Sequence, residues 1–170
     1  VGATEARRKA IAKRQQELVN AVDEEITRLG IEHDEHGNRA KAYLYCLEVK
    51  CPETGWMVPL CPSWVVSKSR KVIARMIPDH PRKRFDIKLF ENASADEMRE
   101  ADKGTAQDGA LVYELDGKTY RTTIRTLRGD YRNNDGTTNN NLRHWGRSDF
   151  APESSDLLQE RLYAIQWMTR

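Results

Sequence analysis

The stretch AYLYCLEVKCPETGWMVPLCPSWVVSK, residues 42–68, decides how this chain folds. Apolar side chains alternate along residues 43–49, which is the period-2 pattern of a β-strand with both faces partly covered. Residues 52–55, Pro-Glu-Thr-Gly, are typical of a turn, and residues 56–60 resume the strand pattern. This stretch therefore predicts a β-hairpin.

Before the hairpin, the spacing of apolar residues predicts one long helix over residues 4–29, with Thr4 as its N-cap and Gly30 as its stop. One thin stripe runs along it, formed by Ile11, Gln15, Leu18, Val22, Ile26 and Leu29. Its first half is basic (Arg7, Arg8, Lys9, Lys13, Arg14) and its second half acidic (Asp23, Glu24, Glu25). This charge order opposes the helix dipole at both ends.

After the hairpin, the pattern predicts further short strands and a short helix that begins at Ser94, with Glu97 at capping-box spacing, and ends near Asp102. Asp116-Gly117 predicts a second hairpin. Residues 133–149 have almost no apolar pattern and predict a mobile loop, whereas residues 157–168 fit a helix and a strand equally. The prediction is an α+β fold with a long N-terminal helix and a mostly antiparallel sheet.

We accordingly expect a helical arm over residues 1–30, an α+β core over residues 31–132, and a C-terminal part over residues 133–170 in which a mobile loop precedes an element that packs on the core. The length of 170 residues suits one domain, and a first residue of Val1 predicts that the chain is cut from a longer protein. No apolar run suggests a membrane span and no signal segment is visible, so we expect no membrane partner. Three cysteines, an odd number, favour a cytoplasmic location.

The sequence holds no glycine-rich phosphate loop, no GxSxG and no HExxH, so a stand-alone enzyme has weak support. A zinc ribbon needs paired ligands two residues apart, and the chain has no CxxC. Cys46 and Cys51 lie five apart on a predicted strand, and their side chains therefore point to opposite faces. A zinc site formed by Cys51, Cys61 and a histidine stays open as an alternative.

Basic residues gather in three clusters, although the net charge is only +2: Lys68, Arg70 and Lys71; Arg82, Lys83 and Arg84; and Arg121, Arg125, Arg128 and Arg132. Trp64 and Tyr131 lie near two of them. Because phosphate attraction dominates nucleic-acid affinity, local clusters matter more than net charge. The clusters therefore favour a nucleic-acid partner, and a mixed solvated surface stays open as the alternative.

The stretch quoted above resembles the middle of large adenine-specific DNA methyltransferases that begin with an uncharacterised conserved domain. In that family a strand leads into a cysteine knuckle, then a "PL" pair, an aromatic stretch and "SK". The tail Gln159-Glu-Arg-Leu-Tyr-Ala-Ile-Gln-Trp167 is also similar to it. The resemblance implies a zinc-ribbon-like pair of hairpins, with knuckle positions at Cys51, Thr54, Tyr113 and Asp116. Only one of the four is a cysteine, which implies a degenerate ribbon without metal.

The family's catalytic and S-adenosylmethionine-binding motifs match nothing in this chain. The resemblance therefore implies a non-catalytic DNA-recognition or accessory domain. DNA would be its partner, and the phosphates would be faced by Arg82, Lys83, Arg84, Arg125 and Arg128. The parent enzyme would use S-adenosylmethionine to methylate adenine N6, and its remaining domains would be partners of this one. A structural spacer or protein-interaction domain, whose long helix docks on the enzyme or on a second subunit, and a zinc-binding module stay open as alternatives.

Overall fold

A computed structural model describes residues 4–168, which divide into two units: residues 44–164, and a smaller unit formed by the described residues before 44 and after 164. The division falls inside two strands, β1 (Arg39–Lys50) and β11 (Leu158–Met168), and not at Gly30, where the predicted arm ends. Among the described residues, no helix is long and apolar enough to cross a membrane.

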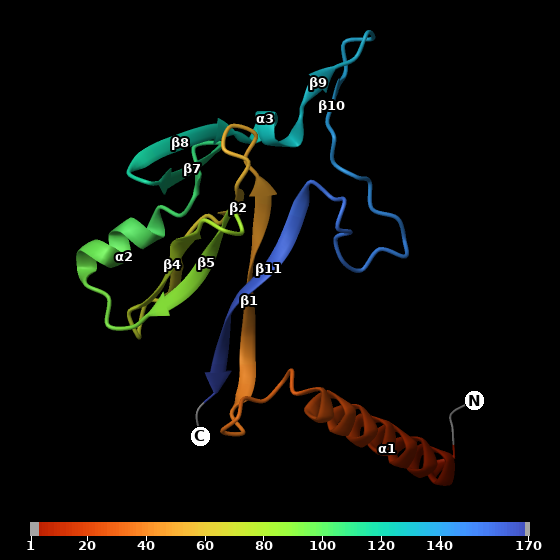
Figure 1. Ribbon diagram of the computed structural model, residues 1–170. Helices are drawn as coiled ribbons and strands as arrows, with labels where there is room; N and C mark the ends of the chain where they lie inside the picture. The colour runs from red at the N-terminus through yellow and green to blue at the C-terminus, as the bar shows by residue number, and fades with distance from the viewer. Residues whose placement is uncertain (1–3, 169–170) are drawn as a thin grey trace. The chain divides into compact units, whose positions relative to one another are not determined.

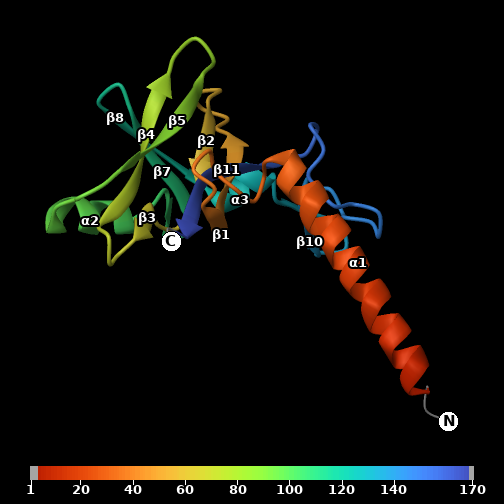
Figure 2. The ribbon, with the colours of Figure 1, turned by 90° about the horizontal axis from the view of Figure 1, so that it is seen from below.

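The smaller unit contains α1 (Glu5–Leu29), the predicted long helix, which is continuous over its whole length (Figure 2). Gly30 ends it in the left-handed conformation, at φ 68°, and its N–H donates to the Thr27 carbonyl. Thr4 occupies the N-cap position, but its side chain makes no capping hydrogen bond. None of the residues of α1 is buried.

The long strands form a six-stranded sheet with the order β11-β1-β2-β5-β4-β3 (Figure 1). The four strands not yet named are β2 (Met57–Leu60), β3 (Val65–Ser67), β4 (Val72–Asp79) and β5 (Arg84–Phe90). The predicted hairpin is confirmed, since β1 pairs with β2 antiparallel with Leu47 opposite Leu60. The pairs β3–β4 and β4–β5 are also antiparallel, whereas β2 meets β5 in parallel at a single register pair.

A second sheet has the order β6-β7-β8, with strands Ala106–Gln107, Ala110–Leu115 and Lys118–Thr123. Asp116 and Gly117 form the predicted turn between β7 and β8, and both have positive φ, at 53° and 76°. Two positive φ angles in a two-residue loop match the right-handed twist of the flanking strands, which explains why Asp-Gly predicts this turn.

Two short helices and a short hairpin complete the larger unit. The helix α2 (Ala95–Asp102) begins with the predicted capping box, in which Ser94 and Glu97 bind each other's backbone N–H groups. The helix α3 (Ile124–Arg128) follows β8 directly. The strands β9 (Tyr131–Arg132) and β10 (Thr138–Asn139) then pair antiparallel, as the hairpin that extends beyond α3 in Figure 1.

Buried side chains form two clusters in the larger unit, because alternate residues of β1 point to opposite faces of its sheet. One cluster contains Val49, Cys51 and Phe85 with Leu111 and Tyr113 of the second sheet, and Leu127 anchors α3 to it. The other contains Cys46, Cys61, Trp64, Ile73, Ala74, Ala93 and Ala101. The C-terminal segment is a strand, and its Leu158 and Tyr163 each pack against one of the clusters.

The stretch predicted as a mobile loop, residues 133–149, contains β10 and an ion-pair cluster around Arg143. The Arg143 guanidinium donates to Asp149 at 2.7 Å and to Asp156 at 2.5 and 2.8 Å. The hydrogen bond to Asp156 is the largest cause that raises the pKa of Arg143. Polar contacts therefore hold this segment where an apolar pattern is missing.

Candidate nucleic-acid interface

The third basic cluster lies where β8 passes through α3 into the β9–β10 hairpin. Thr123 caps α3, because its hydroxyl accepts a hydrogen bond from the Thr126 N–H at 3.2 Å. Gly129 ends the helix at φ 65°, and a Cβ there would lie 2.3 Å from the Asn141 side-chain nitrogen. The Asn141 N–H donates to the Arg128 carbonyl at 2.9 Å, which ties the returning chain to α3. The left-handed conformation favours a glycine where the chain bends tightly beside Arg128.

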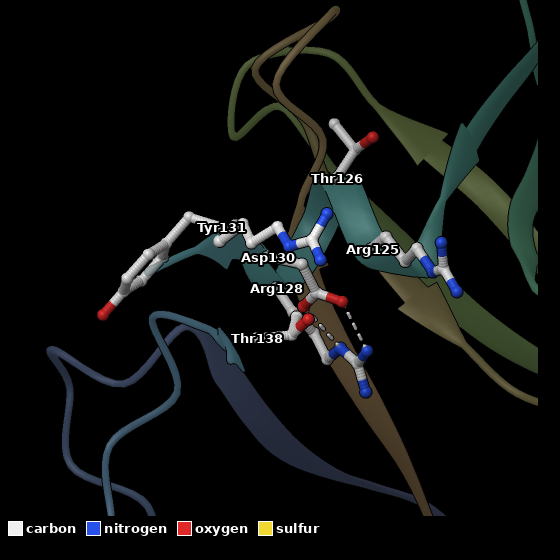
Figure 3. Close-up of a pocket in the computed structure, with 8 residues that line it drawn as sticks. Arg125, Thr126, Arg128, Asp130, Tyr131 and Thr138 are labelled. Carbon is white, nitrogen blue, oxygen red and sulfur yellow. Dashed lines mark hydrogen bonds and ion pairs between the residues drawn. The ribbon is translucent and has the colours of Figure 1, made fainter. Parts of the chain in front are cut away.

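This bend surrounds a hollow of about 820 Å³, lined by Arg125, Thr126, Arg128, Gly129, Asp130, Tyr131, Arg132 and Thr138 (Figure 3). The Tyr131 ring projects to the opposite side of the hollow from the Arg125 guanidinium. Tyr131 is 47% exposed. Three arginines and one carboxylate therefore share this surface with an accessible aromatic ring.

The arginines differ in how they are held. Arg128 donates two hydrogen bonds to Asp130, at 3.1 and 2.7 Å, which raise the pKa of Arg128. Arg132 donates to the Gly136 carbonyl at 3.3 Å. The exposed Arg125 side chain has no hydrogen-bond or ion-pair partner among residues 4–168. One arginine is thus fixed in place, while another offers all its donors to solvent.

Arg121 belongs to the same run of sequence and lies on β8, three residues before α3 begins. Its guanidinium is exposed and makes one long hydrogen bond, 3.4 Å, to the Asp108 carbonyl. Arg121 does not line the hollow, but it adds a largely free cation to the strand that leads into it.

The second basic cluster has other partners. Arg84 is half-buried and forms an ion pair with Glu48 at 2.9 Å. Arg82 forms ion pairs with Asp79 and, at 3.3 Å, with Asp86. Only Lys83 of this cluster is exposed without an ion pair among the described residues. The two arginines predicted to face phosphates thus have protein carboxylates as neighbours.

The first basic cluster lies in the turn between β3 and β4. Lys68, Arg70 and Lys71 are exposed, and their side chains have no ion pair within residues 4–168. Trp64, which the sequence placed near this cluster, is only 6% exposed. It belongs to the core and cannot stack on a base.

Three of the four predicted knuckle positions come together. The Thr54 and Tyr113 hydroxyls lie 2.7 Å apart, and the Cys51 sulfur lies 3.7 Å from the Thr122 hydroxyl. Burial alone would raise the pKa of Cys51, but hydrogen bonds from Tyr113, Thr54 and Thr122 hold it below its usual value. Asp116 is exposed and instead lies 3.3 Å from His80.

The described residues contain no group of three or more His, Cys, Asp or Glu side chains able to hold a metal ion. The alternative set of Cys51, Cys61 and a histidine is not assembled, because the two cysteines belong to different buried clusters. The zinc-ribbon likeness has no support from a metal centre.

Sequence reasoning identified the arginines of the third cluster but missed the hollow they line. The missed residues are Asp130 and Thr138, together with Thr126. A signal for the hairpin was present, since Asn134-Asp-Gly136 is typical of a turn and Gly136 adopts φ 85°. Its flanking strands have two residues each, too few for a period-2 pattern.

Comparisons with protein-family models, curated proteins and solved structures found no match to this chain.

Proposed function

We propose that this chain is a non-catalytic DNA-recognition or accessory domain, and that α3 with the β9–β10 hairpin is its DNA-binding surface. The observation that carries this proposal is the hollow lined by Arg125, Arg128 and Arg132 together with the exposed Tyr131. A single carboxylate, Asp130, offsets three guanidinium charges there. The surface is locally cationic in a chain whose net charge is only +2.

Arginine suits phosphate because its planar guanidinium presents several donors in a rigid fork. Arg128 is oriented by Asp130 and keeps donors for a second partner, whereas Arg125 gives up no existing ion pair when it binds. An exposed tyrosine adds a stacking surface for a base or sugar. These contacts position a protein on the DNA backbone and carry no sequence information directly.

The wider setting of the proposal rests on the resemblance of residues 42–68. The parent would be an adenine-specific DNA methyltransferase, in which other domains bind S-adenosylmethionine and perform methyl transfer. Such enzymes must extrude the target base from the duplex. A domain that holds the flanking backbone supports that step without touching the reacting atoms.

The test is duplex binding measured by fluorescence anisotropy with a labelled oligonucleotide at low salt. The double variant Arg125→Glu/Arg132→Glu removes two cations without breaking an ion pair, and we expect it to weaken binding on the order of a hundredfold. Lys88→Glu on β5 is the control, because Lys88 is exposed and has no ion pair among the described residues. Unchanged affinity in the double variant would refute this surface.

The same experiment addresses the second candidate function. A wild-type chain that does not bind duplex DNA even at low salt would favour a spacer or protein-interaction domain. The helix α1, none of whose residues is buried, is the observation in favour of that function.

We also propose that the two hairpin turns are the remnant of a zinc ribbon, in which hydrogen bonds among Cys51, Thr54 and Tyr113 replace metal ligation. The contact between Thr54 and Tyr113 at 2.7 Å, across 59 residues of sequence, supports this proposal. We expect the protein, purified without chelators and refolded with zinc, to hold far less than one zinc per chain by elemental analysis. Stoichiometric zinc would contradict it and would favour a zinc-binding module.

A further inference from the structure

Apolar side chains form an exposed stripe along the helix α1. Ile11, Leu18, Val22 and Leu29 are 47%, 66%, 48% and 55% exposed, and they lie on one face of a helix without a buried residue. Along its first half the stripe borders a shallow, mostly apolar groove of about 350 Å³ between Arg7 and Leu18. A helix this long is held mainly by packing of its apolar face, so the stripe indicates a partner.

The charges along α1 show which partner fits. The first half contains five cations near the positive end of the helix dipole, and the second half contains Asp23, Glu24 and Glu25 near the negative end. Exposed pairs within the helix, Arg14–Glu17 at 3.1 Å and Arg28–Glu25 at 2.5 Å, contribute little and do not remove this separation. Like charges therefore crowd each half of the isolated helix, although Glu5 in the first turn and Arg28 in the last turn suit the helix dipole.

We propose that α1 pairs antiparallel with α1 of a second copy of this chain. An antiparallel pair places the basic half and positive dipole end of each helix against the acidic half and negative dipole end of the other. The order that is unfavourable in one helix therefore becomes favourable between two. A parallel pair would place like charges together along the whole contact.

The stripe allows this arrangement because it extends along the helix from Ile11 to Leu29 and can meet its own copy about a two-fold axis. At 3.6 residues per turn, Arg7, Arg14 and Glu25 border the stripe along the same flank. Equivalent flanks face each other in an antiparallel pair, which brings Arg14 near Glu25 of the second copy. The inference is independent of DNA binding.

Sedimentation velocity of the whole chain over a concentration series tests the pairing. We expect a monomer–dimer equilibrium in which Leu18→Lys raises the dissociation constant by about a hundredfold, because it removes a contact from both copies. Asn20→Lys is the control, since it adds the same charge on the opposite face of α1. Near-UV circular dichroism should show the larger unit folded in both variants, because α1 contributes no buried side chain.

The dependence on salt and the reversal of charges test whether the two α1 helices pair antiparallel or parallel. An antiparallel dimer weakens when sodium chloride rises from about 50 to 500 mM, whereas a parallel dimer would strengthen. Arg7→Glu/Arg14→Glu and Glu24→Lys/Glu25→Lys should each be monomeric alone and form a heterodimer when mixed. A chain that stays monomeric, a dimer insensitive to Leu18→Lys, or a dimer strengthened by salt would each overturn the proposal.

Discussion

Glu48 is a buried carboxylate that joins three strands. It is 4% exposed and forms ion pairs with Arg84 at 2.9 Å and with Arg161 at 2.6 Å. Arg161 also donates to the Phe85 carbonyl at 2.5 Å. The carboxylate therefore links β1 to β5 and β11, and Arg84 acts as a structural cation of the sheet.

We predict that Glu48→Gln lowers the free energy of unfolding by about 3 kcal/mol, because it leaves two guanidinium groups without their carboxylate. This predicted loss lies at the lower end of what breaking a buried ion pair usually costs, because Arg84 is partly solvated. Urea denaturation measures it. The matched control is Glu114→Gln on β7, where the side chain is exposed and has no ion pair among the described residues. Equal stabilities of the two variants would contradict the structural role of Glu48.

The sequence could identify these basic residues but not their neighbours. Arg82, Lys83 and Arg84 are consecutive and resemble a phosphate-binding cluster as a run of letters. The carboxylate that pairs with Arg84 lies 36 residues earlier, on another strand. The sequence alone therefore does not show which basic clusters have their charge neutralised by carboxylates from distant strands. The cluster around Arg84 and the cluster around Arg125 look alike until the strands are paired.

The connection between α2 and β6 depends on Gly104. Its φ is 60°, and a Cβ at this position would lie 2.3 Å from the Cys61 carbonyl oxygen. The neighbouring Thr105 is buried, and its hydroxyl binds the Cys61 N–H at 2.9 Å and the Pro59 carbonyl at 2.7 Å. Backbone at the end of β2 and just after it is therefore packed directly on this turn.

Gly104→Ala should lower the free energy of unfolding by at least about 2 kcal/mol, because it adds a clash with backbone to the strain of a left-handed residue. Gly109→Ala separates the two effects. Gly109 also has a positive φ, 70°, but no atom lies within 4 Å of its would-be Cβ. It should show only the conformational penalty, about 1 kcal/mol. Similar losses in both variants would show that the close approach at Gly104 is absent.

Elements with a local signal were predictable. The capping box at Ser94 and the turn at Asp116-Gly117 depend on neighbouring residues, and both are confirmed. The sequence did not decide whether the C-terminal segment is a helix or a strand. The strand β11 is half-buried along most of its length, so its side chains follow neither the period of a helix nor that of a strand with one buried face. Its partner β1 lies more than 100 residues earlier, and that pairing leaves no local trace.

The response of the whole molecule to alkaline pH follows from its buried acidic groups. Burial raises the pKa of Cys46 and of Tyr163 to about 12, from ordinary values of 9.0 and 10.0, and it also raises the pKa of Cys61 and of Tyr113. These groups are neutral in the folded chain at a pH where the unfolded chain has already lost their protons. The lowered pKa of Cys51 has the opposite effect on stability at alkaline pH, but it is a single group, whereas four groups have raised pKa values.

We therefore predict that stability is constant with respect to these groups below about pH 8 and falls as pH rises from about 9 towards 12. Urea denaturation at pH 8.0 and pH 10.5, with a reducing agent present, measures the fall. Cys46→Ala should lessen the dependence, because it removes one shifted group. Stability that is level or rises over this interval would mean that these side chains are not buried as described.

The α+β class, the long helix and the predominance of antiparallel strands were correct from sequence, because they depend on periodicity summed over many residues. The hollow beside α3 was not predictable. It requires a hairpin of two-residue strands and a hydrogen bond between Asn141 and Arg128, neither of which has a periodic signature. The net charge of +2 also gave no indication of this cationic surface. Cations and anions that are mixed along the sequence are brought to different surfaces only when the chain folds.

The salt dependence of duplex affinity tests the central claim most directly. Each phosphate contact contributes about 0.9 to the slope of log K against log salt concentration. We predict that Arg125→Glu/Arg132→Glu reduces this slope by about 2 relative to the wild-type chain, whereas Lys88→Glu leaves it unchanged. A slope that stays the same in the double variant, with the chain still folded, would contradict the account and place any DNA contact elsewhere on the molecule.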